Sequence, residues 1–123
     1  CFEIEQEDLE NKTENYAWGF SLGMDYVNVL HVPVVPPVAH LPSEPSVHSV
    51  FTSSGKDAFS PRHLKFLMDY VRANGLTVAG NARGNLICSV VENDKLTGYF
   101  EVWLPIVPRD DLEIAPLPPE APL

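Results

Sequence analysis

One short segment near the C-terminal end of the chain constrains its fold more than any other. Residues 98–106 read Gly-Tyr-Phe-Glu-Val-Trp-Leu-Pro-Ile, which is the pattern of a β-strand. Successive side chains of a strand point to opposite faces. One face would therefore carry an apolar stripe made of Phe100, Val102 and Leu104. The other face would place the Glu101 carboxylate between the rings of Tyr99 and Trp103.

An acid between two aromatic rings indicates a face that is not packed into a core. Burial of an unpaired charge is costly, so Glu101 is not expected inside the apolar interior. Two environments remain compatible with the pattern. Glu101 could lie in the wall of a pocket that accepts a cationic or hydrogen-bond-donating aromatic ligand, or it could be an exposed residue at a sheet edge.

Composition restricts the class of protein. The 123 residues fit one domain or most of one, and 45% hydrophobic and 10% aromatic residues are typical of a globular chain. The net charge of −9, with eight scattered Lys and Arg residues, argues against direct binding of nucleic acid. We see no signal peptide and no long apolar run, so a soluble cytoplasmic domain is expected. Because the sequence begins with Cys1 rather than Met, the N-terminal part of a larger protein is expected to be missing.

A helix is predicted over residues 60–74. Ser60 is a suitable N-cap and Pro61 suits the first helical position, while Gly75 suits the residue after the end. An i, i+3, i+4, i+7 stripe should face the sheet, widened by Phe66 and Tyr70. The stripe consists of Leu64, Leu67, Met68 and Val71.

The remaining segments predict strands near 1–5, 16–24, 46–52 and 85–92, the last placing Cys88 as a buried small hydrophobe. Residues 5–15 read as a solvated acidic loop. Residues 28–45 read as a Pro-rich connection, because proline cannot donate to a sheet ladder. The domain is expected to span 1–107, followed by a Pro-rich tail at 108–123.

Several aromatic residues could line a pocket around Glu101, although plain core packing would explain each one alone. They are Tyr16, Trp18, Phe20, Tyr99 and Trp103. The four histidines show no metal-ligand spacing, and no metal is expected. We find no phosphate loop and no dinucleotide fingerprint, so no cofactor is expected.

Three segments resemble a known family. Residues 99–106 resemble the closing strand of the GyrI-like effector-binding domain, which occurs alone or at the C-terminus of AraC-type and MerR-type transcription regulators. Residues 15–20 and 41–55 resemble two further strands of that domain. The resemblance implies an α+β fold in which an antiparallel sheet carries the helix on one face and a ligand cleft on the other. The family builds it from two strand-helix-strand-strand modules related by pseudo-twofold symmetry.

The resemblance would make the second module complete, at 46–54, 60–74, 85–92 and 98–107. It would leave the first module with only two strands, near 1–5 and 15–25, and without its opening strand and helix.

The resemblance also implies a function. The domain would sense small molecules for a transcription regulator, with large aromatic, often cationic compounds stacking on Trp18, Tyr99 and Trp103 and with Glu101 as counter-charge. Two alternatives remain open. A GyrI-like hydrolase of electrophilic compounds would use Glu101 as a catalytic residue that activates water, and a gyrase-inhibitor-type module would bind a protein through acidic residues 3–14. Further expected partners are a DNA-binding domain elsewhere in the full-length protein and, as an option, a second copy of the chain.

Overall fold

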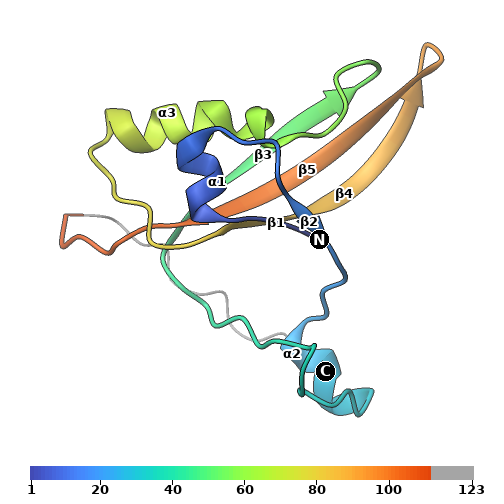
Figure 1. Cartoon of the computed structure of the whole chain (residues 1–123). Coiled ribbons are helices and arrows are strands. Elements are labelled where there is room, and N and C mark those ends of the chain that lie inside the picture. The colour runs from blue at the N-terminus through green and yellow to red at the C-terminus, as the bar shows by residue number, and fades with distance from the viewer. Residues whose placement is uncertain (112–123) are drawn as a thin grey trace.

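The structure is a computed structural model that describes residues 1–111, so most of the expected tail at 108–123 lies outside the described residues. The fold is α+β, with five antiparallel strands in the order β2-β1-β4-β5-β3 (Figure 1). The elements in chain order are β1 (Phe2–Ile4), α1 (Gln6–Asn11), β2 (Ala17–Trp18), α2 (Met24–Val29), β3 (Ser46–Ser54), the 3-10 turn η1 (Pro61–Leu64), α3 (Lys65–Ala73), β4 (Ala82–Glu92) and β5 (Lys95–Pro105).

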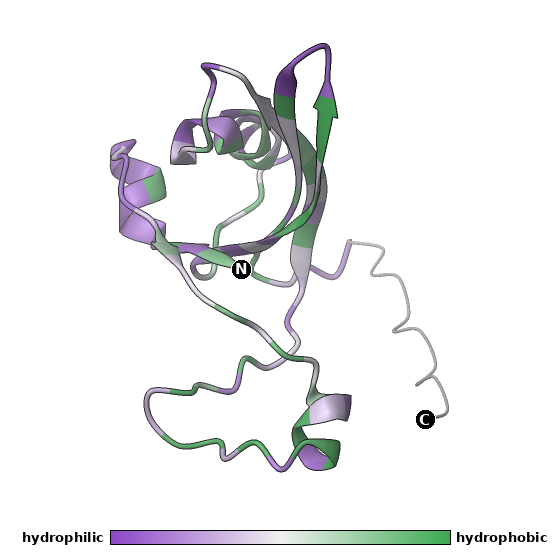
Figure 2. Cartoon of the chain, turned by 90° about the vertical axis from the view of Figure 1, so that its right-hand side faces the viewer, coloured by the Kyte–Doolittle hydropathy of each residue, from purple (hydrophilic) through white to green (hydrophobic). Residues whose placement is uncertain are grey.

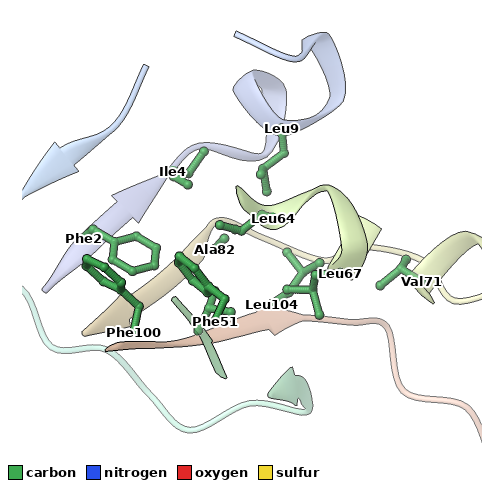
Figure 3. Close-up of a cluster of buried hydrophobic side chains, with 11 residues drawn as sticks. Phe2, Ile4, Leu9, Phe51, Leu64, Leu67, Val71, Ala82, Phe100 and Leu104 are labelled. Atoms are coloured by element: carbon green, nitrogen blue, oxygen red, sulfur yellow. The ribbon is translucent and has the colours of Figure 1, made fainter. Parts of the chain in front are cut away.

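The core lies between one face of the sheet and the two helices α1 and α3 (Figure 3). We call this the inner face and the opposite one the outer face. The predicted apolar stripe of β5 is buried there, with Val102 and Leu104 fully inaccessible. Leu67 and Val71 of α3 pack against it as predicted. Apolar burial of this kind is the main stabilising contribution to such a domain.

The predicted helix at 60–74 is confirmed, with its first turn in the tighter 3-10 form. The Ser60 backbone N–H donates to His63 Nδ1 at 3.2 Å, and Pro61 occupies the first helical position. Gly75 ends the helix with φ of +62°, a conformation that favours glycine. Phe66 and Tyr70, expected to widen the packed stripe, remain exposed.

The acidic loop predicted at 5–15 is wrong, because residues 6–11 form α1. Leu9 is buried in the core, which gives this short helix a tertiary anchor. The side-chain oxygen of Asn81 accepts a hydrogen bond from the Gln6 backbone N–H at 3.0 Å, satisfying a donor that a helix N-terminus leaves free. Asn81 and the core residues that Leu9 contacts lie outside residues 5–15. The charges of that segment alone therefore predicted a solvated loop.

The long strand predicted at 16–24 is also wrong. Pairing ends after Trp18, and the chain then leaves the sheet for an excursion at 19–45 that contains α2 (Figures 1 and 2). Backbone hydrogen bonds hold both ends of the excursion. Gly19 N–H donates to the Cys1 carbonyl, the Cys1 amino group donates to the Gly19 carbonyl, and Ile106 N–H donates to the Pro45 carbonyl at 3.0 Å. Most large apolar side chains of the excursion are exposed: Phe20, Leu22, Met24, Tyr26, Val29, Leu30, Val34, Val35, Val38 and Leu41.

Cys88 is exposed, which corrects the expectation of a buried residue. A register shift between Leu86 and Cys88 interrupts the β4–β5 ladder. Beyond it the hairpin projects past the helices (Figure 1), so its residues have no layer above them. Within residues 1–111, no helix is long and apolar enough to cross a membrane.

Candidate functional site

The outer face carries a row of polar and aromatic side chains across four strands. Residues directly opposed in antiparallel strands share a face. Glu3 of β1 opposes Arg83 of β4, Arg83 opposes Trp103 of β5, and Trp103 opposes His48 of β3. The imidazole of His48 stacks on Trp103, with ring centroids 4.8 Å apart and planes inclined by 29°. The row therefore carries a stacked His48–Trp103 pair at one end and the Glu3–Arg83 ion pair at the other.

Glu101 lies in the next row of the same face. It opposes Asn85 on β4 and Val50 on β3. The Asn85 side-chain amide donates to Glu101 Oε1 at 3.3 Å, and His48 Nε2 lies 3.4 Å from Glu101 Oε2. The Glu101 side chain is 27% exposed. It is thus oriented by a neutral amide and an imidazole while still reachable from solvent.

Arg83, two residues from Asn85 on β4, is already engaged. Its Nε donates to Glu3 Oε2 at 2.6 Å, and its Nη1 lies 3.8 Å from Glu44 Oε1. This bond from Arg83, assisted by Asn81, holds the pKa of the Glu3 carboxyl below its usual range against the opposing effect of burial. Among the described residues no Lys or Arg lies within ion-pair distance of Glu101. Its negative charge therefore remains uncompensated by any permanent cation.

A hollow of about 410 Å³ borders this arrangement. Trp103 and Asn85 line it from the sheet, and Ser21 and Leu41 line it from the excursion. Ser21 also donates to the Asn85 oxygen at 3.3 Å, which links the excursion to the Asn85–Glu101 pair. The remaining lining residues are Cys1, Phe2, Glu3, Ala17, Trp18, Gly19, Arg83 and Gly84. Glu101 adjoins the hollow through Asn85 rather than forming its floor.

The residues predicted as one site are divided between the two faces. Tyr99, Glu101 and Trp103 lie on the outer face, as strand alternation predicted. The Trp18 ring instead packs on the inner side, 5.8 Å from Phe2.

Tyr16 joins Trp18 on the inner side, and both rings contact Phe59, at centroid distances of 5.0 and 5.2 Å. Phe20 lies in the excursion, wholly exposed at 105%. The structure thus does not bring Tyr16 or Phe20 to Glu101, and it brings Trp18 only to the border of the hollow.

A second hollow, about 170 Å³, lies between α1 and α3. Leu9, Leu64 and Met68 contribute its apolar surface. Two cations at its rim are already paired, since Arg62 bonds Asp57 and Lys65 bonds Asp69. Lys12 and Glu14 also line this groove and form no ion pair among the described residues, but no aromatic side chain lines it, so it lacks the ring surface found beside Glu101.

Sequence reasoning missed the partners of Glu101. His48 was considered only as a metal ligand, and Asn85 and Arg83 were not considered. The alternation of side chains within each strand is visible in the sequence. Whether His48 and Asn85 lie beside Glu101 depends on the β3–β5 and β4–β5 registers, which no single strand specifies. In the part of the chain that the structure describes, no cluster of three or more metal-ligating side chains occurs.

Comparison with known proteins leaves the family open. No protein-family profile matches the chain, and neither a curated protein nor a solved structure matches it.

Proposed function

We propose that the chain is a small-molecule sensor domain that binds flat aromatic cations on the outer face, with Trp103 as stacking surface and Glu101 as counter-charge. The observation that carries the proposal is the Glu101 carboxylate, without a permanent cation beside it, near the partly exposed Trp103 ring and a hollow. The resemblance to GyrI-like domains supports the same function. From the same resemblance we propose that the domain contains two modules related by pseudo-twofold symmetry. The complete module consists of β3, α3, β4 and β5, and β1 and β2 belong to the other module.

The physical basis is the sum of two moderate attractions. A cation over an indole ring gains about 0.5–2 kcal/mol, depending on how far it is desolvated. A partly exposed ion pair adds up to about 1 kcal/mol. Apolar surface in the hollow, including Leu41, would shield the rest of a flat ligand from water. Affinity should therefore be modest and tolerant of ligand shape.

His48 limits this site in a specific way. When its imidazole is protonated it supplies the positive charge that Glu101 lacks, because the two groups lie 3.4 Å apart. A bound cation and a protonated His48 would then compete for the same carboxylate.

The test compares two ligands of similar outline on two proteins. N-methylquinolinium is a permanent cation, and quinoline is its neutral counterpart in mildly alkaline solution. Glu101→Gln keeps the size of the side chain and removes its charge. We expect this variant to weaken binding of the cation by up to about fivefold while leaving the affinity for quinoline nearly unchanged.

A matched control is Glu92→Gln, which removes the same charge from an exposed position near the far end of β4. It should leave both affinities unchanged. Equal losses for cation and neutral ligand in Glu101→Gln would contradict the counter-charge role. Consumption of an electrophilic substrate that disappears in the same variant would favour the hydrolase alternative instead.

A further inference from the structure

The two borders of the sheet differ in regularity. β2 and β1 cover one border only beside Ala82–Gly84 of β4, and the rest of β4 on that side is irregular, with a register shift between Leu86 and Cys88. β3 forms the other border with nine residues; it pairs with β5, and its last residue, Ser54, also accepts a backbone hydrogen bond from Asp57 in an isolated bridge (Figure 1). The free border of β3 therefore presents a row of backbone donors and acceptors that another strand could complete.

The sequence of β3 lacks the devices that usually block such pairing. Native edge strands carry Lys, Pro, a bulge or a very short length. β3 reads Ser-Val-His-Ser-Val-Phe-Thr-Ser-Ser, without proline or a fixed charge, and its register with β5 is uninterrupted over all nine residues. This edge is open to a further strand.

The side chains next to this edge are also unusually apolar for a solvent surface. Phe66 of α3 lies over β3, with its ring 6.4 Å from that of Phe51. Tyr70 follows one helical turn later, so it lies on the same side of α3. Phe66 and Tyr70 are 43% and 53% exposed, and Val50, at the centre of β3 on the outer face, is 53% exposed. Apolar side chains thus flank the open edge on both faces of the sheet.

We infer that β3 pairs antiparallel with β3 of a second copy of this chain, forming a continuous ten-stranded sheet about a twofold axis at Val50. The second copy fits because the edge is self-complementary. With Val50 opposite its own counterpart, His48 opposes Thr52, so the seven residues 47–53 pair without like fixed charges and clear of the Ser54–Asp57 bridge. Inner-face residues meet inner-face residues, which keeps both α3 helices on one side.

The same arrangement covers the exposed aromatic residues. Because α3 lies over the edge of the sheet, the two α3 helices become neighbours across the axis. Phe66 and Tyr70 of each copy then face the other helix. Central aromatic contacts of this type contribute most of the binding energy in many interfaces. This inference concerns assembly and does not depend on the proposed ligand site.

Sedimentation velocity of the 123-residue chain over a range of concentrations tests the inference. Wild type should sediment as a dimer of the 13.7 kDa chain. Tyr70→Glu should raise the dimer dissociation constant about tenfold or more. The matched control is Tyr26→Glu, since Tyr26 of α2 is similarly exposed but remote from β3, and it should leave the constant unchanged. A monomeric wild type, or equal effects of the two variants, would overturn the inference.

Cross-linking gives a second readout that needs no loss of stability. In a background with Cys1 and Cys88 changed to serine, Val50→Cys should form covalent dimers with a short bifunctional thiol reagent. Val91→Cys provides the control, because Val91 is more exposed yet lies on β4, which β5 separates from β3. Equal cross-linking of both variants would reflect random collision and would also overturn the inference.

Discussion

Gly84 lies directly beneath the ring of Phe2, its partner across the β1–β4 pair. A Cβ atom at position 84 would approach Phe2 Cζ to 2.5 Å and would also collide with the Glu101 carbonyl oxygen. The absence of a side chain at this position allows the Phe2 ring to lie flat on β4. Through that ring the short N-terminal strand joins the aromatic cluster of the inner face.

Gly84→Ala should therefore destabilise the fold by about 1–3 kcal/mol, the usual range for overpacking in a well-packed interior. Urea unfolding followed by circular dichroism would measure the free energy. Gly80→Ala is the matched control, because a Cβ there would lie 3.6 Å from Pro105, an ordinary contact distance. Equal losses for the two variants would show that the Phe2–Gly84 contact is not the cause.

Leu67→Ala should lower the free energy of unfolding by about 2–5 kcal/mol, because Leu67 is only 2% exposed and its removal leaves a cavity between α3 and the sheet. Lys65→Ala, on the exposed surface of the same helix, should change stability by no more than about 0.5 kcal/mol. A loss below about 1 kcal/mol for Leu67→Ala would mean that the sheet–helix contact can close around the missing atoms.

The two tryptophans should respond differently to ligand. Both tryptophans border the hollow, but Trp103 lies on the outer face next to Glu101 in the sequence alternation, whereas the Trp18 ring packs against Phe59 on the inner side. N-methylquinolinium should quench the emission of Trp18→Phe, which retains Trp103. It should quench Trp103→Phe much less. The opposite result would place the ligand in the inner-face aromatic cluster and would contradict the proposed site.

The Glu3–Arg83 pair should make stability depend on pH in the acid range. Because the pKa of Glu3 is lowered in the folded state, its stabilising contribution is fully present above its ordinary pKa. That contribution is lost as the pH falls through the folded-state pKa. Glu3→Gln should thus reduce stability at neutral pH, by at most about 1 kcal/mol for so exposed a pair.

The measurement is the free energy of unfolding of wild type and Glu3→Gln from neutral pH downward. The difference between the two proteins should shrink towards acid and vanish once Glu3 is protonated. Lys at position 83 offers a conservative check, since Arg83→Lys keeps the charge but loses the directed Nε donor to Glu3. A difference that stays constant with pH would exclude the ion pair as its source.

The periodic spacing of apolar residues predicted β5 and α3 correctly. The alternation around Val102 assigned both faces of β5 correctly, and the spacing around Leu67 located α3. In each case the signal repeats along one element, and burial of one side follows from it. α1 was missed because a single residue, Leu9, anchors it and no periodic pattern can arise from one residue.

The candidate site was predictable only in part, for a related reason. Glu101 and Trp103 lie two residues apart on one strand, so alternation alone places them on one face. Trp18 was grouped with them by residue type, but it opposes Phe2, and Phe2 faces the core. Which face a short strand presents depends on its pairing partner, and that information is distributed over distant segments of the chain.

The excursion at 19–45 can change the shape of the hollow independently of the stability of the sheet. Its ends are hydrogen-bonded to the sheet at Gly19 and Pro45. The sheet therefore requires these two ends to be in place but does not fix the number of residues between them. Closing a loop costs free energy that grows only logarithmically with its length. Insertions or deletions here would reshape the Ser21 and Leu41 wall of the hollow while the scaffold stays intact. Variation in this segment can therefore retune which molecules fit beside Trp103 without endangering the fold that holds it.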